Sequence, residues 1–349
     1  MTDTLHDTVK TYYGETLTSS ADLQTNACCD MSAPPAEVKA LLDKIHPDVR
    51  DRYYGCGLLA PAALRGARVL DLGCGAGQDV YALAQMVGPE GHVTGVDMTE
   101  AQLAVARGTE DWHRQSFGYD ASNVRFIEGY LEDLAALNLE PGSFDVIVSN
   151  CVINLTADKG AVFAGAHHLL REGGEIYFSD VYADRRLPEA LKADPELWGE
   201  CLSGALYSRD FLQLAREAGF THPLRVSSRP FEVTSGALAD KLGAARFVSE
   251  TWRLFKHPEL EAEAEDYGDQ ARYLGGADGA ETVLELEESL HLTKGEPQAI
   301  SRNMAKILAN SRFAPFVDII PGGQNHRGGF SAGPVVAPSD SPSKSGCCG

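Results

Sequence analysis

Residues 67–77 of the chain read Ala67-Arg68-Val69-Leu70-Asp71-Leu72-Gly73-Cys74-Gly75-Ala76-Gly77. The apolar run at its start predicts a buried strand. The glycines that follow let the backbone turn tightly and approach a ligand closely. A helix is expected next, at 78–87, and its amino terminus would point into the same space. The stretch therefore predicts a strand, a nucleotide-binding loop and a helix.

Strand and helix signals alternate from this stretch to residue 180. Strands are expected at 67–72, 92–97, 124–128, 144–149 and 175–180, with helices at 78–87, 100–115 and 159–171. This alternation predicts right-handed crossovers and a parallel, doubly wound α/β sheet of Rossmann-like type.

The glycine spacing separates two classes of cofactor. A nicotinamide dinucleotide loop would have a further glycine at position 78, and Gln78 stands there. Asp71 before the glycines and Asp97 at the end of the second strand resemble instead the pattern of class I S-adenosylmethionine-dependent methyltransferases, in which the second acid binds the ribose hydroxyls. The alternative is a structural glycine turn with Asp97 on a solvated strand end.

The resemblance assigns a cofactor site to residues 67–180. Tyr53 and Tyr54 could place an aromatic face against the sulfonium, or pack the amino-terminal cap onto the sheet. The expected cofactor-binding residues are Tyr54, Asp71, Gly73, Gly75, Gly77, Asp97, Met98, Gly129, Tyr130, Leu131 and Asn150.

Length and charge restrict the remaining possibilities. The 349 residues exceed one average domain. A net charge of −20 disfavours nucleic acid and anionic membrane surfaces as partners. Because neither a signal peptide nor a long apolar run is visible, we expect a soluble cytoplasmic protein, and a monomer by default.

The chain is expected to have five regions. They are a helical cap at 1–60, the cofactor domain at 61–182, a substrate-binding region at 183–235, a small α+β domain at 236–320 and a disordered tail at 321–349.

Cys151 follows the fourth strand, at the edge of the sheet where ligands react. Methyltransferases that act on nucleobase amines place Asn-Pro-Pro-Tyr there, but this chain has Asn150-Cys151-Val152-Ile153. Cys56 precedes the first strand and Cys201 follows the fifth, so three thiols can converge on one pocket. Soft thiolates select thiophilic centres, and trivalent arsenic bonds three sulfurs while keeping a nucleophilic lone pair.

Several separated segments together resemble arsenite methyltransferases across nearly the whole chain. They are Asp22-Leu23-Gln24-Thr25-Asn26-Ala27-Cys28, Arg52-Tyr53-Tyr54-Gly55-Cys56-Gly57, Val148-Ser149-Asn150-Cys151-Val152-Ile153-Asn154-Leu155, Tyr177-Phe178-Ser179-Asp180-Val181-Tyr182, Leu197-Trp198-Gly199-Glu200-Cys201, Arg246-Phe247-Val248-Ser249 and Asn310-Ser311-Arg312-Phe313.

The resemblance implies roles for four cysteines. Arsenite would be held by Cys151 and Cys201, with Cys56 as third ligand or redox partner and Cys28 pairing with Cys56 during turnover. Methylated arsenicals would be further substrates, and glutathione or thioredoxin would return two electrons after each methylation.

Some assignments stay open. Cys29 could replace Cys28, Cys74 is expected to fill space, and Cys347 and Cys348 could capture arsenicals or be dispensable. The alternatives are a carbon or oxygen methyltransferase for a small lipophilic acceptor, and a non-catalytic arsenic-binding protein.

Overall fold

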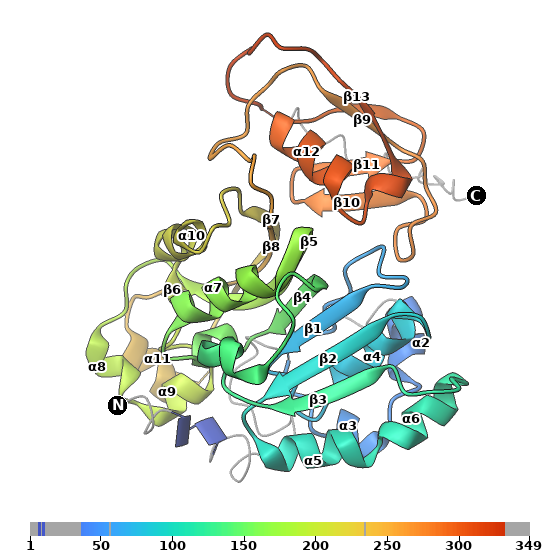
Figure 1. The fold of residues 1–349 in the computed structure, drawn as a ribbon. Helices are drawn as coiled ribbons and strands as arrows, with labels where there is room; N and C mark the ends of the chain where they lie inside the picture. The colour runs from blue at the N-terminus through green and yellow to red at the C-terminus, as the bar shows by residue number, and fades with distance from the viewer. Residues whose placement is uncertain (1–5, 8, 11–35, 56, 234, 332–349) are drawn as a thin grey trace, which may run out of the picture.

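The computed structural model describes residues 6–7, 9–10, 36–55, 57–233 and 235–331. A central sheet is covered by helices, and a smaller C-terminal domain lies against one end of it (Figure 1). The sheet has the strand order β3-β2-β1-β4-β5-β8-β7, with β6 paired to β5. Its strands are β1 (Arg68–Leu72), β2 (His92–Asp97), β3 (Val124–Glu128), β4 (Phe144–Asn150), β5 (Leu170–Ala183), β6 (Leu206–Tyr207), β7 (Leu224–Phe231) and β8 (Phe247–Phe255).

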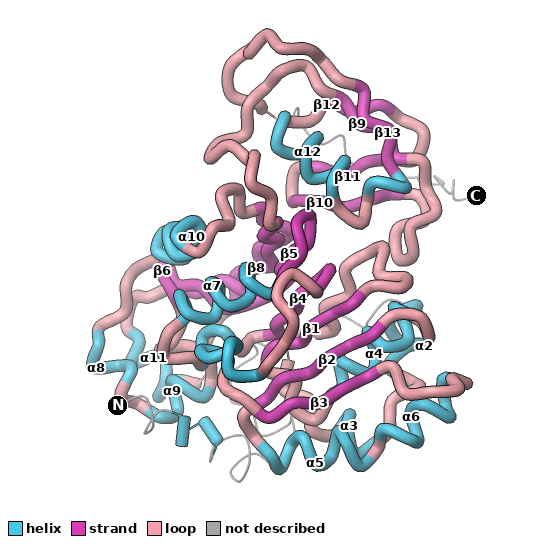
Figure 2. The backbone as a smooth tube through the Cα atoms, viewed as in Figure 1, coloured by secondary structure: helices cyan, strands magenta, loops and turns pink. Residues whose placement is uncertain are grey.

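Helices occupy both faces of this sheet, as Figure 2 shows for the helices and strands in separate colours. The helices are α2 (Ala36–Leu42), α3 (Pro47–Arg50), α4 (Gln78–Val87), α5 (Glu100–Gly108), α6 (Glu110–Phe117), α7 (Lys159–Leu169), α8 (Glu189–Lys192), α9 (Pro195–Gly199), α10 (Ser208–Glu217) and α11 (Gly236–Leu242), with 3₁₀ turns η3 (Leu131–Leu137) and η4 (Ile153–Leu155). None of the helices in the described residues is long and apolar enough to cross a membrane.

Successive residues of the buried strands face opposite layers. Val146 and Val148 of β4 pack with α4, and Ile147 between them packs with Phe163 of α7. Strands covered on both faces read as continuous apolar runs. This is why the sequence of β1 and β4 predicted buried parallel strands correctly.

The predicted doubly wound α/β sheet is confirmed. β1 pairs in parallel with β2 and β4, β2 with β3, and β4 with β5. The sheet continues beyond the five predicted strands, because β8 pairs antiparallel with β5 and β7 antiparallel with β8. The strand at 247–255 therefore lies in the central sheet, although the sequence places it in a C-terminal domain that starts at residue 236.

Two predicted helices differ from those observed. The helix expected at 100–115 is broken at Thr109, whose hydroxyl donates to the carbonyls of Val105 and Ala106. Such side-chain bonds compete with the helical backbone. The helix expected at 159–171 ends at Leu169, because Leu170 is extended and pairs with Phe144 of β4.

The C-terminal domain contains the two-stranded sheet β10 (Val283–Glu287) and β11 (Leu290–Thr293), and the three-stranded sheet β12 (Pro297–Ala299), β9 (Gln270–Tyr273) and β13 (Val317–Ile320). Helix α12 (Arg302–Asn310) and the turn η5 (Ala314–Phe316) pack against them. Ala62, Ala63, Leu224 and Phe255 share this domain's apolar core. The C-terminal domain is therefore packed onto the cofactor domain.

Part of the expected disordered tail is ordered. Gly322 donates to Asp269, and the amides of Arg327 and Phe330 donate to the carbonyls of Asp266 and Ala264. Residues 321–331 are thus hydrogen-bonded to the C-terminal domain. The predictions for Cys28, Cys29, Cys56, Cys347 and Cys348 concern positions outside the described residues.

Candidate active site

The glycine loop connects β1 to α4 in the predicted way. Gly73, Gly75 and Gly77 have φ values of 79°, 52° and 90°, a region that side chains rarely adopt. A Cβ atom on Gly73 would lie 2.4 Å from the side chain of Val152. Glycine is therefore required at position 73 for two reasons: its φ is positive, and the side chain of Val152, just after β4, leaves no room for a Cβ atom.

Asp97, the last residue of β2, holds the glycine loop through a hydrogen bond. Its carboxylate accepts hydrogen bonds from the amides of Gly75 at 2.9 Å and Thr99 at 2.8 Å. Burial raises the pKa of Asp97, although these amide bonds oppose the shift. The acid predicted to bind the ribose is therefore already oriented by the loop and by the start of α5.

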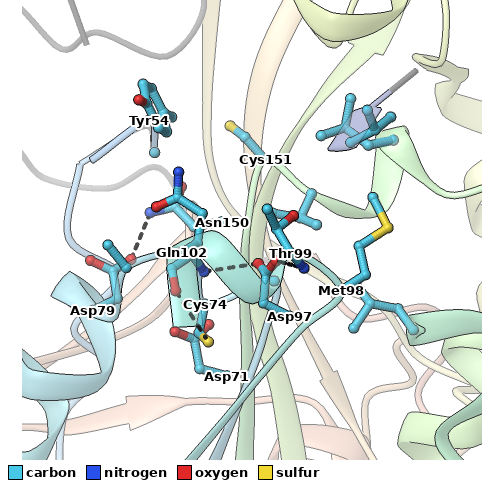
Figure 3. Close-up of a pocket in the computed structure, with 18 of the residues that line it drawn as sticks. Tyr54, Asp71, Cys74, Asp79, Asp97, Met98, Thr99, Gln102, Asn150 and Cys151 are labelled. Carbon is cyan, nitrogen blue, oxygen red and sulfur yellow. Dashed lines mark hydrogen bonds between the residues drawn. The ribbon is translucent and has the colours of Figure 1, made fainter. Parts of the chain in front are cut away.

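Asn150 joins three segments at the other side of the loop. Its Nδ2 atom lies 2.8 Å from the Tyr53 hydroxyl, 2.7 Å from the Gly57 carbonyl and 2.9 Å from a carboxylate oxygen of Asp79. Figure 3 shows the Asn150 and Asp79 pair, with Tyr54 and Cys151 nearby. Asn150 thus ties the segment before β1 to the first turn of α4.

Three acids, Asp71, Asp79 and Asp97, line this site, and the first two are buried. Burial raises the pKa of Asp79 to about 7, against hydrogen bonds from Asn150 and Tyr53. Burial also raises the pKa of Asp71, and the charges of Asp79 and Asp97 raise it further. One oxygen each of Asp71 and Asp79 is buried without a hydrogen-bond partner among the described residues. The amino group of S-adenosylmethionine could donate hydrogen bonds to such oxygens and its sulfonium could offset their charge, so the residues present fit this cofactor.

Most predicted cofactor residues line one pocket. Its empty volume is about 1010 Å³, part of it open to solvent, which is sufficient for a nucleoside-sized ligand. Those that line it are Tyr54, Asp71, Gly73, Gly75, Asp97, Met98, Gly129, Leu131 and Asn150, and Cys151, predicted as an arsenic ligand, lines the same pocket. Gly77 instead caps α4. Tyr130 is not among the lining residues, and its ring stacks on His6 with centroids 4.5 Å apart.

Cys151 is buried at the end of β4 in an unusual backbone conformation. Its φ is 58°, and its amide donates to the carbonyl of Ser179 on β5 at 2.9 Å. The following turn is held by Asp180, whose carboxylate accepts from the amides of Asn154 and Val181. Contacts with β5 thus fix the backbone that places Cys151 in the pocket wall.

Cys201 lies directly against Cys151. Its sulfur is 3.1 Å from the Cys151 carbonyl oxygen and its φ is 59°. Cys201 is 1% exposed and packs in the same apolar cluster as Cys151 and Trp198. The two cysteines that the sequence assigns to one site are therefore brought together, with Cys151 facing the pocket and Cys201 behind it.

Cys151 is disulfide-bonded in this structure. The other two cysteines of the described residues, Cys74 and Cys201, are thiols. Cys74 is buried in the core beside the loop, where burial raises the pKa of its thiol. No group of three histidine, cysteine or acidic side chains within the described ranges forms a metal-binding cluster.

Sequence reasoning missed one charged residue that lines the pocket, Asp79, and one that lies near Cys201, Lys159. Asp79 lies in the first turn after the glycine loop, and that position was the available signal. Lys159 begins α7 and is buried against Trp198, with its ammonium 5.3 Å from the ring centre and donating to the carbonyls of Asn154 and Thr156. Burial lowers the pKa of Lys159 to about 8. Nothing local in the sequence marks this lysine, because its partners are backbone carbonyls.

The parallel sheet, the glycine loop and the acid pocket together define an S-adenosylmethionine-dependent methyltransferase. A methyltransferase-domain family model matches residues 64–219, and the model of the arsenite methyltransferase C-terminal domain matches residues 267–348. The chain belongs to the arsenite methyltransferase family, and its cofactor is S-adenosylmethionine.

Individual relatives cover nearly all of the chain. The arsenite methyltransferase of Aquipseudomonas alcaligenes is 52% identical over 93% of this chain and 94% of its own length. The human arsenite methyltransferase is 44% identical over 93% of this chain and 86% of its own. The crystal structure of an arsenic (III) S-adenosylmethionine methyltransferase from Chlamydomonas reinhardtii matches with a TM-score of 0.82 and 44% identity, over 86% of this chain and 100% of that one.

Proposed function

We propose that this chain methylates trivalent arsenic that is held by Cys151 and Cys201, with Cys56 as third ligand or redox partner. The observation that carries the proposal is the contact of the Cys201 sulfur with the Cys151 carbonyl, at a wall of the cofactor pocket. The relatives named above carry the same activity in their names.

The thiolates position the acceptor and exclude water. S-adenosylmethionine supplies, when bound, a methyl group on a positively charged sulfur. Cys151 lies in the same pocket as the glycine loop, so an arsenic atom on its sulfur would face that methyl group. With both bound, the arsenic lone pair would take up the methyl group as the carbon–sulfur bond of the sulfonium broke, and no base would be required of the protein. The protein contributes mainly alignment and desolvation.

Each transfer changes the redox state of arsenic. Its formal oxidation state rises by two, so two electrons must return before the next transfer. We propose that two site thiolates supply them and form a disulfide, which glutathione or thioredoxin then reduces. Cys28 and Cys56 are the pair proposed for this step.

The substrates proposed are arsenite and methylated arsenicals, and the proposed acting unit is a monomer. The test supplies purified protein with S-adenosylmethionine, arsenite and a thiol reductant, and then separates the arsenic species by mass. Methylated arsenic is the expected product. Arsenite binding without any methylated product would favour an arsenic-binding protein, and methylation of a lipophilic acceptor in place of arsenite would favour a carbon or oxygen methyltransferase.

A further inference from the structure

The segment between the cofactor pocket and β1 also contacts the C-terminal domain. At one end, Tyr53 and Gly57 contact Asn150 in the pocket. A few residues later, Ala62 and Ala63 lie in the apolar core of the C-terminal domain. Figure 1 shows this blue segment reaching the orange domain ahead of β1. The two sites of contact are thus connected by a short stretch of chain.

The C-terminal domain holds the backbone of both alanines. The Arg312 Nε atom donates to the Ala62 carbonyl at 2.9 Å, and the Ala63 amide donates to the Asp278 carbonyl at 2.9 Å. Both contacts involve the main chain of the segment. They therefore fix its path whatever the side chains there are.

Ala63 adopts a conformation that needs such support. Its φ is 61°, in the left-handed region that residues with a Cβ atom rarely adopt. Residues in such conformations persist when the surrounding structure holds them there. The hydrogen bonds on either side of the Ala62–Ala63 peptide provide this restraint.

Arg312 is itself held by the central sheet. Its guanidinium pairs with Glu175 of β5 at 2.6 Å and stacks on Phe313 with its centre 4.4 Å from the ring centroid. Glu175 is fully buried and also pairs with Arg253 of β8 at 3.0 Å. Arg312 thus joins the sheet, the C-terminal domain and the segment before β1.

We propose that Arg312 is a positioning residue through which the C-terminal domain sets the cofactor affinity of the pocket. The stretch from Gly57 to Ala62 can span at most about 18 Å, and Pro61 removes freedom from it. Holding Ala62 and Ala63 therefore restricts where Gly57 and Tyr53 meet Asn150. Loss of the Ala62 contact lets these groups leave the pocket wall.

Calorimetric binding of S-adenosylhomocysteine tests this without arsenic, so the result does not depend on the proposed acceptor. Arg312→Lys keeps a positive charge beside Glu175, but it loses the planar guanidinium that contacts Glu175 and the Ala62 carbonyl at the same time. We expect its dissociation constant to rise about fivefold or more, as for a modest coupling between sites. Arg272, a half-buried arginine of the same domain that pairs with Asp318, provides the matched control, and Arg272→Lys should bind normally.

A second substitution separates positioning from a general loss of structure. Glycine adopts the Ala63 conformation without strain, so Ala63→Gly added to Arg312→Lys should restore affinity to within about twofold of the wild type. Wild-type affinity in Arg312→Lys, or no rescue by Ala63→Gly, would overturn the proposal.

The wild-type protein provides a measurement that does not require a variant. Saturating S-adenosylhomocysteine should slow amide hydrogen exchange in peptides covering residues 57–66, including the Ala63 amide. If exchange there does not change while exchange in the glycine loop slows, the segment does not couple the C-terminal domain to the pocket.

Discussion

The Cys201 sulfur lies 3.1 Å from the carbonyl oxygen of Cys151, and both residues have left-handed φ values, 59° and 58°. Conformations of this kind cost on the order of 1–3 kcal/mol each and concentrate at functional sites. Two adjacent cysteines in this state indicate that the fold maintains their arrangement at a cost in stability. This arrangement is what the proposed shared arsenic ligand would require.

Replacing either cysteine by serine should therefore abolish arsenite methylation. Serine preserves the size and the hydrogen-bonding capacity of the side chain but binds arsenic poorly. We expect the rate of product formation in Cys151→Ser and in Cys201→Ser to fall by about 100-fold or more, equivalent to an activation free energy higher by about 2.7 kcal/mol. Mass-resolved arsenic speciation measures this. Affinity for S-adenosylhomocysteine should stay near the wild-type value, and full activity in either variant would remove that cysteine from the site.

The amino-terminal thiols should matter unequally along the reaction series. We expect Cys28→Ser and Cys56→Ser to lose methylation of arsenite but to keep methylation of monomethylated arsenic, which offers only two bonds to sulfur. Time courses started from each arsenical would compare the two steps. Equal loss at both steps would contradict the division of roles.

The disulfide at Cys151 should block arsenic binding. Protein oxidised under mild conditions should bind no arsenite, since this cysteine cannot ligate arsenic while it is bonded to another sulfur. Addition of glutathione or thioredoxin should restore binding, because thiols reopen disulfides by exchange. Titration with arsenite before and after reduction measures the effect. Equal arsenite affinity in the two states would show that Cys151 is not a required ligand.

Asp79 should couple cofactor binding to pH. Its pKa in the folded protein is about 7, so its carboxylate becomes charged as the pH rises through 7. Affinity for cationic S-adenosylmethionine should rise over this interval, and affinity for neutral S-adenosylhomocysteine should rise less. Asp79→Asn should weaken binding of the cation and flatten the profile. Calorimetry between pH 6 and 8.5 checks both expectations, and an unchanged pH dependence in the variant would assign the titration to another group.

The same substitution should increase thermal stability. A carboxyl whose pKa rises from its ordinary value of 3.8 to about 7 on folding destabilises the folded state progressively as the pH rises between those values. Asp79→Asn should therefore raise the melting temperature at pH 8, by roughly 2–4 °C per kcal/mol recovered. The increase should be smaller at pH 5.5. A larger gain at the lower pH would contradict the sign of the shift.

The buried ion pairs of Glu175 with Arg253 and Arg312 should contribute to the stability of the folded protein. Glu175→Gln leaves Arg253 and Arg312 buried without a negative partner, which typically costs about 3–5 kcal/mol. Chemical denaturation should show this loss. Glu172→Gln, an exposed position on the same strand, is the matched control and should change stability by less than about 0.5 kcal/mol. Equal effects of the two substitutions would argue against these ion pairs as a source of stability.

The cofactor half of the site was predictable because its signals are local. The glycine loop, Asp97 and the apolar strands lie within short windows of sequence, and each implies a backbone conformation or burial pattern directly. The position of Cys151 followed from the same strand pattern. Its convergence with Cys201 was expected from the places of the two cysteines after the fourth and fifth strands, and the structure places the two in contact.

Other features depend on residues far apart in the sequence. The pairing of β8 with β5 joins Phe255 to Glu175, and neither segment contains a local indication of its neighbour. The break at Thr109 arises from a hydroxyl that bonds to the preceding turn, which helical periodicity does not reveal. Asp79 was missed because an acid in the first turn of a helix is common for reasons unrelated to ligands.

The shared apolar core of Ala62, Ala63, Leu224 and Phe255 with the C-terminal domain bears on how the chain unfolds. A domain whose interior includes side chains from its neighbour cannot separate without exposing apolar surface on both. We therefore expect the described residues of the two domains to unfold in one cooperative transition, and a fragment that ends near residue 256 to aggregate instead of folding independently.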